Sequence, residues 1–278
     1  MKQRSIIAAA AAALLAGGAT GIAAHAAAAG PTAVLIGAHS SDGFTSAGKA
    51  LGPLSAARFY YNGALPASFR NTPASQLPAG VVPVISYNTQ TTNVLAYVKS
   101  VNRPIWLAFH HEPEDHGAYS SGAVFVSQFE AQSKLIRSAG NPDVMVVSIN
   151  AGYAYRTGGG NGLNGSYLPP ASYVDAYALD LYEICCTGER WPAKGLADYD
   201  RFQNWLKLVG NRGKPLGITE YGIEASDAVR DARIQADASY LRSYFGGKFG
   251  LWCYFWVGIW RFTDAPTVAT WRSIAAAS

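Results

Sequence analysis

The sequence predicts an α/β protein built as a single (β/α)8 TIM barrel, and three observations support that fold class. Eight short apolar runs recur along the chain, and most are rich in branched and aromatic residues without strict alternation. Such runs are typical of strands buried on both faces of a parallel sheet. Amphipathic helical patterns separate several of the runs. Once an N-terminal segment is set aside, about 250 residues remain, which is the usual size of one such barrel.

The expected strands cover residues 33–38, 57–61, 81–87, 104–110, 144–150, 174–182, 215–221 and 251–257. Three gaps between them show a helical face: Phe125, Phe129 and Ile136; then Tyr199, Phe202, Leu206 and Val209; then Ile234, Ala238, Leu241 and Phe245. Alternating strands and helices imply right-handed crossovers and a parallel sheet. A doubly wound open sheet is the alternative, but the turn after the first strand, residues 37–41, lacks the G-x-G-x-x-G pattern of nucleotide-binding sheets.

Residues 1–29 have the pattern of a secretory signal peptide. Lys2 and Arg4 precede an apolar stretch over residues 6–15, and Ala24-His25-Ala26 offers a cleavage site. A membrane anchor is the alternative, but the apolar stretch is short for a bilayer span and three glycines follow it. We therefore expect a secreted, extracellular protein without membrane attachment after cleavage, in which residues 30–278 form one catalytic domain.

The charge composition argues against a nucleic-acid partner. Charged residues make up 14% of the chain, against about a quarter in typical soluble domains. The formal net charge is +4, and without Lys2 and Arg4 it falls to +2, from 20 basic against 18 acidic residues. Because there is no basic run, we expect no nucleic-acid partner. We also expect a monomer.

The three cysteines allow at most one disulfide within the chain. Export permits disulfides, so Cys185 and Cys186 form a vicinal bridge, or one of them pairs with Cys253. The remaining alternative is that Cys253, which lies inside an apolar run, is a buried thiol.

Catalytic residues of TIM barrels lie at the carboxyl ends of the strands, which directs attention to the polar residues that end each run. The fourth run ends in the sequence HHEPE over residues 110–114, and the seventh ends in TEYG over residues 219–222. Glu112 and Glu220 would therefore lie across one bowl. Paired carboxyl groups are what cleavage of a glycosidic bond requires, since one protonates the leaving oxygen and the other attacks the sugar or positions water.

These motifs resemble the large clan of retaining glycoside hydrolases that carry an acid/base and a nucleophile glutamate on strands four and seven. The likeness is closest to family 26, which contains β-mannanases and has a His-Glu pair where His111-Glu112 stands here. Pro113, VDAYALDLY at 174–182 and KPLGITEYG at 214–222 are similar to further motifs of the clan, in the same order. The first half of the chain offers no matching motif.

The resemblance implies a glycoside hydrolase that cleaves a β-linked polysaccharide or oligosaccharide by double displacement. Glu112 would be the general acid/base and Glu220 the nucleophile, with no cofactor and no metal. Endo-β-mannanase activity is one expectation; glucan, xylan or a cell-envelope glycan, and exo action, remain open. Glu114 is the main rival to Glu112.

Further residues near the strand ends are candidates for binding substrate. Arg58 and Tyr182 would donate to Glu220, and His111 would bind a sugar hydroxyl or orient a carboxylate, while its neighbour His110 points the other way. Asn150 ends the fifth strand. Aromatic rings stack on sugars, and the candidates near strand ends include Tyr87, Trp191 and Trp256. Trp256 resembles the clan's platform for the cleaved sugar.

Two other function classes compete with this interpretation. A non-catalytic carbohydrate-binding barrel would keep the aromatic residues and lose one carboxylate, whereas both are present. A metal-dependent hydrolase would use the cluster over residues 110–116, which contains three histidines and three acidic residues. Adjacent residues on a strand diverge, and no second ligand cluster with recognisable spacing is evident, so this class is disfavoured.

Overall fold

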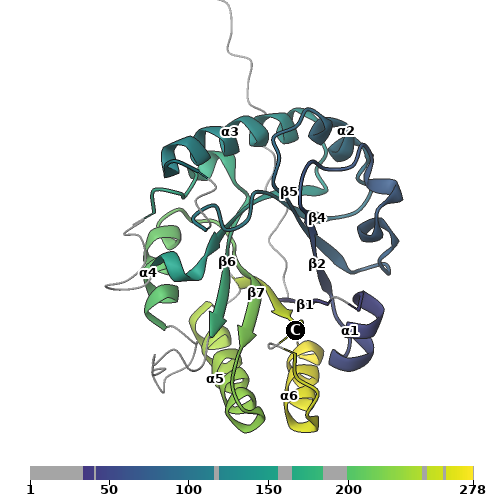
Figure 1. Ribbon diagram of the computed structural model, residues 1–278, viewed down its shortest axis with the longest axis vertical. Coiled ribbons are helices and arrows are strands. Elements are labelled where there is room, and N and C mark those ends of the chain that lie inside the picture. The colour runs from purple at the N-terminus through teal and green to yellow at the C-terminus, as the bar shows by residue number, and fades with distance from the viewer. Residues whose placement is uncertain are drawn as a thin grey trace, which may run out of the picture.

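The computed structural model describes residues 34–40, 42–115, 119–155, 165–183, 199–245, 249–258 and 261–277. Within them, eight parallel strands close into a barrel in chain order, which confirms the predicted (β/α)8 fold (Figure 1). The strands are β1 (Leu35–His39), β2 (Ala56–Tyr61), β3 (Val82–Tyr87), β4 (Ile105–Phe109), β5 (Val144–Ala151), β6 (Ala176–Glu183), β7 (Leu216–Ile223) and β8 (Phe249–Phe255). The predicted signal segment, Cys185, Cys186 and Trp191 lie outside the described residues.

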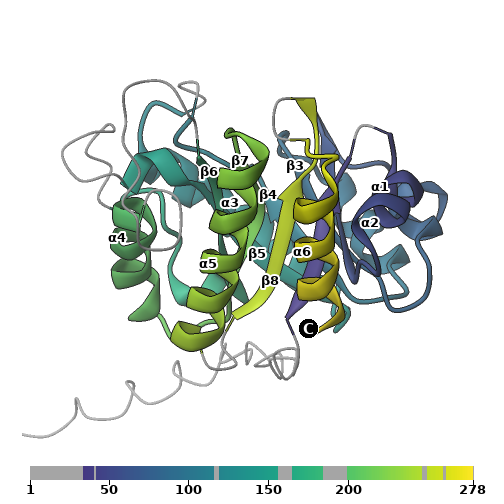
Figure 2. The same cartoon turned by 90° about the horizontal axis from the view of Figure 1, so that it is seen from below.

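Helices surround the strands on the outside of the barrel, and Figure 2 shows β8 running between two of them. They are α1 (Phe44–Leu51), α2 (Asn93–Ser100), α3 (Gly122–Ser138), α4 (Tyr199–Gly210), α5 (Asp227–Phe245) and α6 (Ala265–Ala276). The helical faces read from the sequence correspond to α3, α4 and α5. The helices α1 and α2 have eight residues each, too few for a helical period to stand out. No helix in the described part of the chain is long and apolar enough to cross a membrane.

Side chains alternate between the barrel interior and the helical layer, as the pleat of a strand requires. Along β8, Leu251 and Cys253 belong to the interior cluster, and Trp252 and Tyr254 belong to the outer one. The interior is filled by Trp106 together with small residues, among them Ala56, Val84, Ala108, Ala176 and Ala178. Cys253 is a buried free thiol in this layer, which is the third of the alternatives read from the sequence.

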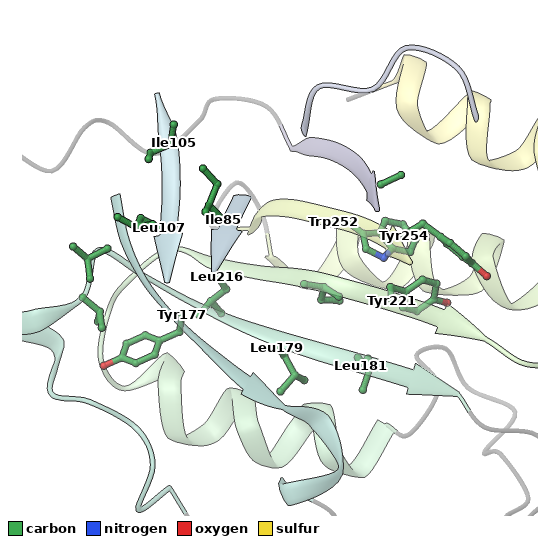
Figure 3. Close-up of a cluster of buried hydrophobic side chains, with 14 of the residues drawn as sticks. Ile85, Ile105, Leu107, Tyr177, Leu179, Leu181, Leu216, Tyr221, Trp252 and Tyr254 are labelled. Carbon is green, nitrogen blue, oxygen red and sulfur yellow. The ribbon is translucent and has the colours of Figure 1, made fainter. Parts of the chain in front are cut away.

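The outer core holds the helices against the barrel through aromatic contacts. Tyr221 lies edge-on to Trp252 and Tyr254, at ring-centroid distances of 5.1 and 5.7 Å (Figure 3). Trp271 of α6 packs against the same two β8 rings at 5.0 and 5.1 Å. Each such pair contributes about 0.5–1.5 kcal/mol beyond the burial of its area. Strand β8 is thereby fixed to α6 and to β7, the strand that carries Glu220.

Gly37 on β1 lies where the barrel interior has no room for a side chain. A Cβ atom at this position would come within 2.6 Å of Cys253 Sγ and 2.8 Å of the carbonyl oxygen of Ala56. Contacts this short force the strands apart, since the second of them is backbone.

We predict that Gly37→Ala lowers the free energy of unfolding by about 1–3 kcal/mol, because overpacking displaces β1 from its neighbours. Urea denaturation monitored by circular dichroism measures the change. Gly48→Ala in α1 is the matched control, since a Cβ there meets nothing within 4 Å and alanine favours a helix. Equal unfolding midpoints for Gly37→Ala and the unsubstituted protein would contradict the packing of β1 described here.

Candidate active site

Polar and aromatic side chains cover the carboxyl-terminal mouth of the barrel, in the layer above the apolar interior. They come from inward positions of six strands and from the loop after β4, which carries His111 and Glu112. The strand residues are His39, Arg58, Tyr60, Ser86, Asp180, Tyr182, Glu220 and Phe255. The mouth therefore joins the first half of the chain, where no motif was evident, to the second half.

A β-bulge turns Glu220 into the barrel. Strands β6 and β7 pair in register up to Leu179 and Ile218, and the next pair is Asp180 with Glu220, so Thr219 is an extra residue. Without it, Glu220 would pair with Leu181, whose side chain faces the helices. Bulges of this kind re-aim side chains next to active sites.

Glu220 is a buried carboxylate with strong donors. Arg58 Nη2 donates to its Oε1 over 3.3 Å, and the Tyr182 hydroxyl donates to its Oε2. Arg58 is held in turn, because its Nη1 donates to Ser86 Oγ over 2.9 Å and to the Phe59 carbonyl over 3.1 Å. Burial raises the pKa of Glu220, but the charge of Arg58 and the Tyr182 hydrogen bond outweigh it and hold the pKa below its usual value. Glu220 is therefore ionised at neutral pH, as predicted for these two donors.

Glu112 lies in a backbone conformation that non-glycine residues seldom adopt. Its φ is +49°, that of His110 is +54°, and its backbone N–H donates to the Ile149 carbonyl over 3.0 Å. Burial, followed by the negative charge of Glu220, raises the pKa of the Glu112 carboxyl to about 8. Two glutamates at one barrel mouth thus differ in protonation at neutral pH, since Glu112 keeps its proton and Glu220 does not.

The two adjacent histidines point in different directions, as predicted. His111 Nδ1 lies 3.0 Å from Ser86 Oγ, and its ring lies 5.2 Å from that of Tyr60. Because Ser86 Oγ already accepts from Arg58, its own hydrogen is free to donate to His111 Nδ1. Burial lowers the pKa of His111 to about 4, so Nε2 carries the proton of the neutral ring. His110 instead packs edge-on against Tyr119 at 4.9 Å.

Metal ligation finds no support in the described residues, among which no group of three or more histidine, cysteine or acidic side chains could hold a metal ion. His116, part of the cluster considered in the sequence, lies outside them.

Glu114 and Asn150 face each other behind the mouth. Asn150 is fully buried, and its Nδ2 donates to Glu114 Oε1 over 2.7 Å. The backbone N–H of Ala151 donates to Glu114 Oε2 over 3.1 Å. The prediction that Asn150 binds substrate is therefore wrong. Side chains alternate along β5, and because Ile149 points into the barrel, Asn150 points out of it. Glu114 is likewise engaged with β5, which leaves Glu112 as the acid candidate.

Tyr87 and Trp256 also point away from the mouth, so the prediction that they bind substrate is wrong. Tyr87 follows the inward Ser86 by one residue, is fully buried, and donates from its hydroxyl to Gln132 of α3 over 3.0 Å. Trp256 is 3% exposed, and its Nε1 donates to the Phe262 carbonyl over 2.8 Å. One step of side-chain alternation accounts for both errors.

His39, Tyr60 and Phe255 are residues of the mouth that the sequence analysis missed. The His39 ring stacks on Phe255 at 5.1 Å and meets the Tyr60 ring edge-on at 4.7 Å. His39 Nδ1 lies 3.1 Å from the Arg58 carbonyl, which only accepts, so Nδ1 carries the proton. Counting by two from Leu251 along β8 and from Ala56 along β2 would have found Phe255 and Tyr60. Phe255 takes the place expected of Trp256 as the aromatic face at the end of β8.

Solved structures that share this fold include several glycoside hydrolases, although no family model and no curated protein matches the sequence. A triple variant of an endo-β-1,4-glucanase from Xanthomonas axonopodis pv. citri aligns at a TM-score of 0.60 and 10% identity, over 88% of this chain and 100% of that one. An endo-β-1,3-glucanase of family GH128 from Sorangium cellulosum aligns at 0.57 and 14% identity, over 86% and 98%. A family GH26 β-mannanase from Bacteroides ovatus aligns at 0.52 and 10% identity, over 88% and 89%.

These likenesses confirm the barrel fold and extend over several glycoside hydrolase families, so they assign the chain to none of them. The expected relation to family 26 is thus one of several at similar TM-scores.

We predict that Tyr182→Phe raises the pKa of Glu220 by about one unit, because a hydrogen bond to a charged group is worth about 1.5–3 kcal/mol. Carboxyl ¹³C NMR titration of protein labelled at glutamate measures it. Tyr87→Phe is the matched control, since that hydroxyl bonds Gln132 outside the barrel. An unchanged Glu220 titration in Tyr182→Phe would show that this hydrogen bond does not stabilise the carboxylate.

Proposed function

We propose that this protein is a retaining glycoside hydrolase that cleaves β-linked polysaccharides. The observation that carries the proposal is the pair of glutamates at one barrel mouth, Glu112 with a raised pKa and Glu220 with a lowered pKa. One proton donor and one ionised nucleophile are the two groups that double displacement requires. The fold shared with glucanases and a mannanase supports the same class of reaction.

In the first step, the Glu220 carboxylate attacks the anomeric carbon while Glu112 gives its proton to the leaving glycosidic oxygen. In the second, the Glu112 carboxylate takes a proton from water, and the hydroxide oxygen bonds to the anomeric carbon as the bond to Glu220 breaks. Arg58 and Tyr182 each donate to a different oxygen of Glu220 and hold this carboxylate in place for the attack. Carboxyl groups that act in this way lie about 5–5.5 Å apart, which is the separation we expect in a substrate complex.

The proposed substrate is a β-linked hexose polymer. The structures that share the fold are described as acting on β-1,4-glucan, β-1,3-glucan and β-mannan. The Phe255 ring at the end of β8 is half-buried and stacks on the His39 ring, and we propose that its exposed part contacts the C–H groups of a sugar. A panel of mannan, cellulose, β-1,3-glucan and xylan, with reducing ends counted against chain length, identifies the polymer and separates endo from exo action.

We further propose that the protein is secreted, on the strength of the charged, apolar and small-residue pattern of residues 1–29. Expression of the full chain followed by N-terminal sequencing of protein from the medium tests this. Retention in the cell with Met1 intact would contradict it.

We predict a bell-shaped pH dependence of kcat/KM. Activity needs Glu220 ionised, so it rises as pH passes the lowered pKa of that carboxyl, and it needs Glu112 protonated, so it falls as pH passes about 8. Initial rates on the accepted polymer from pH 3 to 10 measure both limbs. An activity that keeps rising above pH 9 would exclude Glu112 as the proton donor.

We predict that Glu220→Gln and Glu112→Gln each lower kcat on the accepted polymer by at least about a hundredfold. A positioned proton donor typically contributes at least that factor to the rate. A 2-fluoro glycoside with a good leaving group should add one sugar to Glu220, located by peptide mass spectrometry. Glu130→Gln on α3 is the control for loss of a carboxylate. Near-full turnover by either active-site variant would remove that residue from the mechanism.

A further inference from the structure

We propose that Glu114 is a positioning residue that clamps the loop after β4 onto the top of β5 and so fixes Glu112 in the mouth. The inference rests on the proposed function of Glu112 as the proton donor. Glu114 itself is 5% exposed and meets β5 rather than the mouth, so it acts through its neighbour.

The loop after β4 needs such a clamp because its backbone is strained. The pairing of β4 with β5 extends to Leu107 and Val146, and beyond it the chain turns through His110 and Glu112, both at positive φ. Each such residue costs about 1–3 kcal/mol, which the surrounding structure must offset. The Glu112 N–H bond to Ile149 and the His110 N–H bond to the Tyr87 carbonyl are two such contacts, and Glu114 adds several more.

Glu114 joins the loop to β5 and to the 3-10 helix η3 (Gly152–Tyr155) that follows it. Its Oε1 accepts from Asn150 Nδ2 over 2.7 Å and from the Tyr155 hydroxyl over 3.0 Å, and its Oε2 accepts from the Ala151 N–H over 3.1 Å. The Glu114 carbonyl accepts from the Tyr153 hydroxyl over 2.9 Å. Four donors from one segment thus converge on one residue of the loop.

The donor set requires a side chain with two acceptor oxygens, which a carboxyl group has and an amide lacks. Asn150 Nδ2 and the Ala151 N–H only donate, and they meet opposite oxygens of Glu114. A glutamine has one acceptor oxygen, so one buried donor would lose its partner and face an NH₂ group. Leaving a buried donor unpaired is more costly than the net worth of the bond that is lost.

The clamp reaches Glu112 through a tight turn. The Asp115 N–H donates to the Glu112 carbonyl over 2.9 Å, so Glu112 and Glu114 belong to one hydrogen-bonded turn. A shift of Glu114 away from β5 therefore moves the Glu112 backbone. The charge of Glu114 also helps to raise the pKa of Glu112, after burial and the charges of Glu220 and Asp115.

The test compares Glu114→Gln and Tyr155→Phe with Glu130→Gln, a control carboxylate on α3. We expect Glu114→Gln to lower kcat by about ten- to a hundredfold with little change in KM, because displacement of a catalytic group by about 1 Å costs up to that much. The ¹³C titration of the Glu112 carboxyl, assigned with Glu112→Gln, should move to lower pH. Tyr155→Phe, which removes one donor and keeps the ring, should move both quantities in the same direction by less.

A purely structural Glu114 would give a different result. Glu114→Gln would then lower the thermal unfolding midpoint while kcat and the Glu112 titration matched those of Glu130→Gln, and this outcome overturns the proposal. If Glu114→Gln does not fold, Tyr155→Phe decides by the same two readouts. The two proposals can fail separately. Full turnover by Glu112→Gln would contradict the proposed function, whereas the Glu112 titration needs no substrate and still tests the clamp.

Discussion

The ion pair between Arg58 and Glu220 determines the electrostatics of the whole barrel mouth. Both side chains are almost fully buried and lie 3.3 Å apart. Removal of one partner from such a pair leaves an uncompensated buried charge, at a cost of about 3–5 kcal/mol. The guanidinium keeps Glu220 ionised, and the resulting negative charge helps Glu112 to keep its proton. One contact between β2 and β7 therefore keeps Glu220 ionised and, together with burial, helps to keep Glu112 protonated.

Asp180 shows how this division of charge is maintained. It lies beside Glu220 on β6, is buried, and accepts a hydrogen bond of 2.5 Å from Thr219 Oγ1. Burial, followed by the charges of Glu220 and Glu112, raises the pKa of Asp180 well above its usual range. Because Asp180 is neutral, it does not compete with Glu220 for the positive charge of Arg58. Of the three acidic side chains, Glu220 is ionised while Glu112 and Asp180 are neutral, because only Glu220 pairs directly with the charge of Arg58.

Sequence reasoning predicted four residues that the structure brings together at the mouth, and it failed where side-chain direction decides. The prediction included Glu112 and Glu220, because a carboxylate at a strand end is informative whichever way its neighbours point. It also included Arg58 and Tyr182, as the donors that an ionised Glu220 needs. Tyr87 and Trp256 each stand one position from a residue that does face the mouth. Alternation has a period of two, so an error of one residue in the strand reverses the inference.

The remaining gap between sequence and structure lies in the loop after β4. Its positive-φ residues are His110 and Glu112, neither of which is a glycine that would mark the turn in advance. The contacts that hold it come from residues 36 to 41 positions further along the chain, on β5 and η3. Local propensity cannot reveal a conformation that distant donors impose. The two glutamates of HHEPE differ only once the fold has brought β5 beside β4. Glu112 then faces the mouth, and Glu114 binds β5 and holds the loop that carries Glu112.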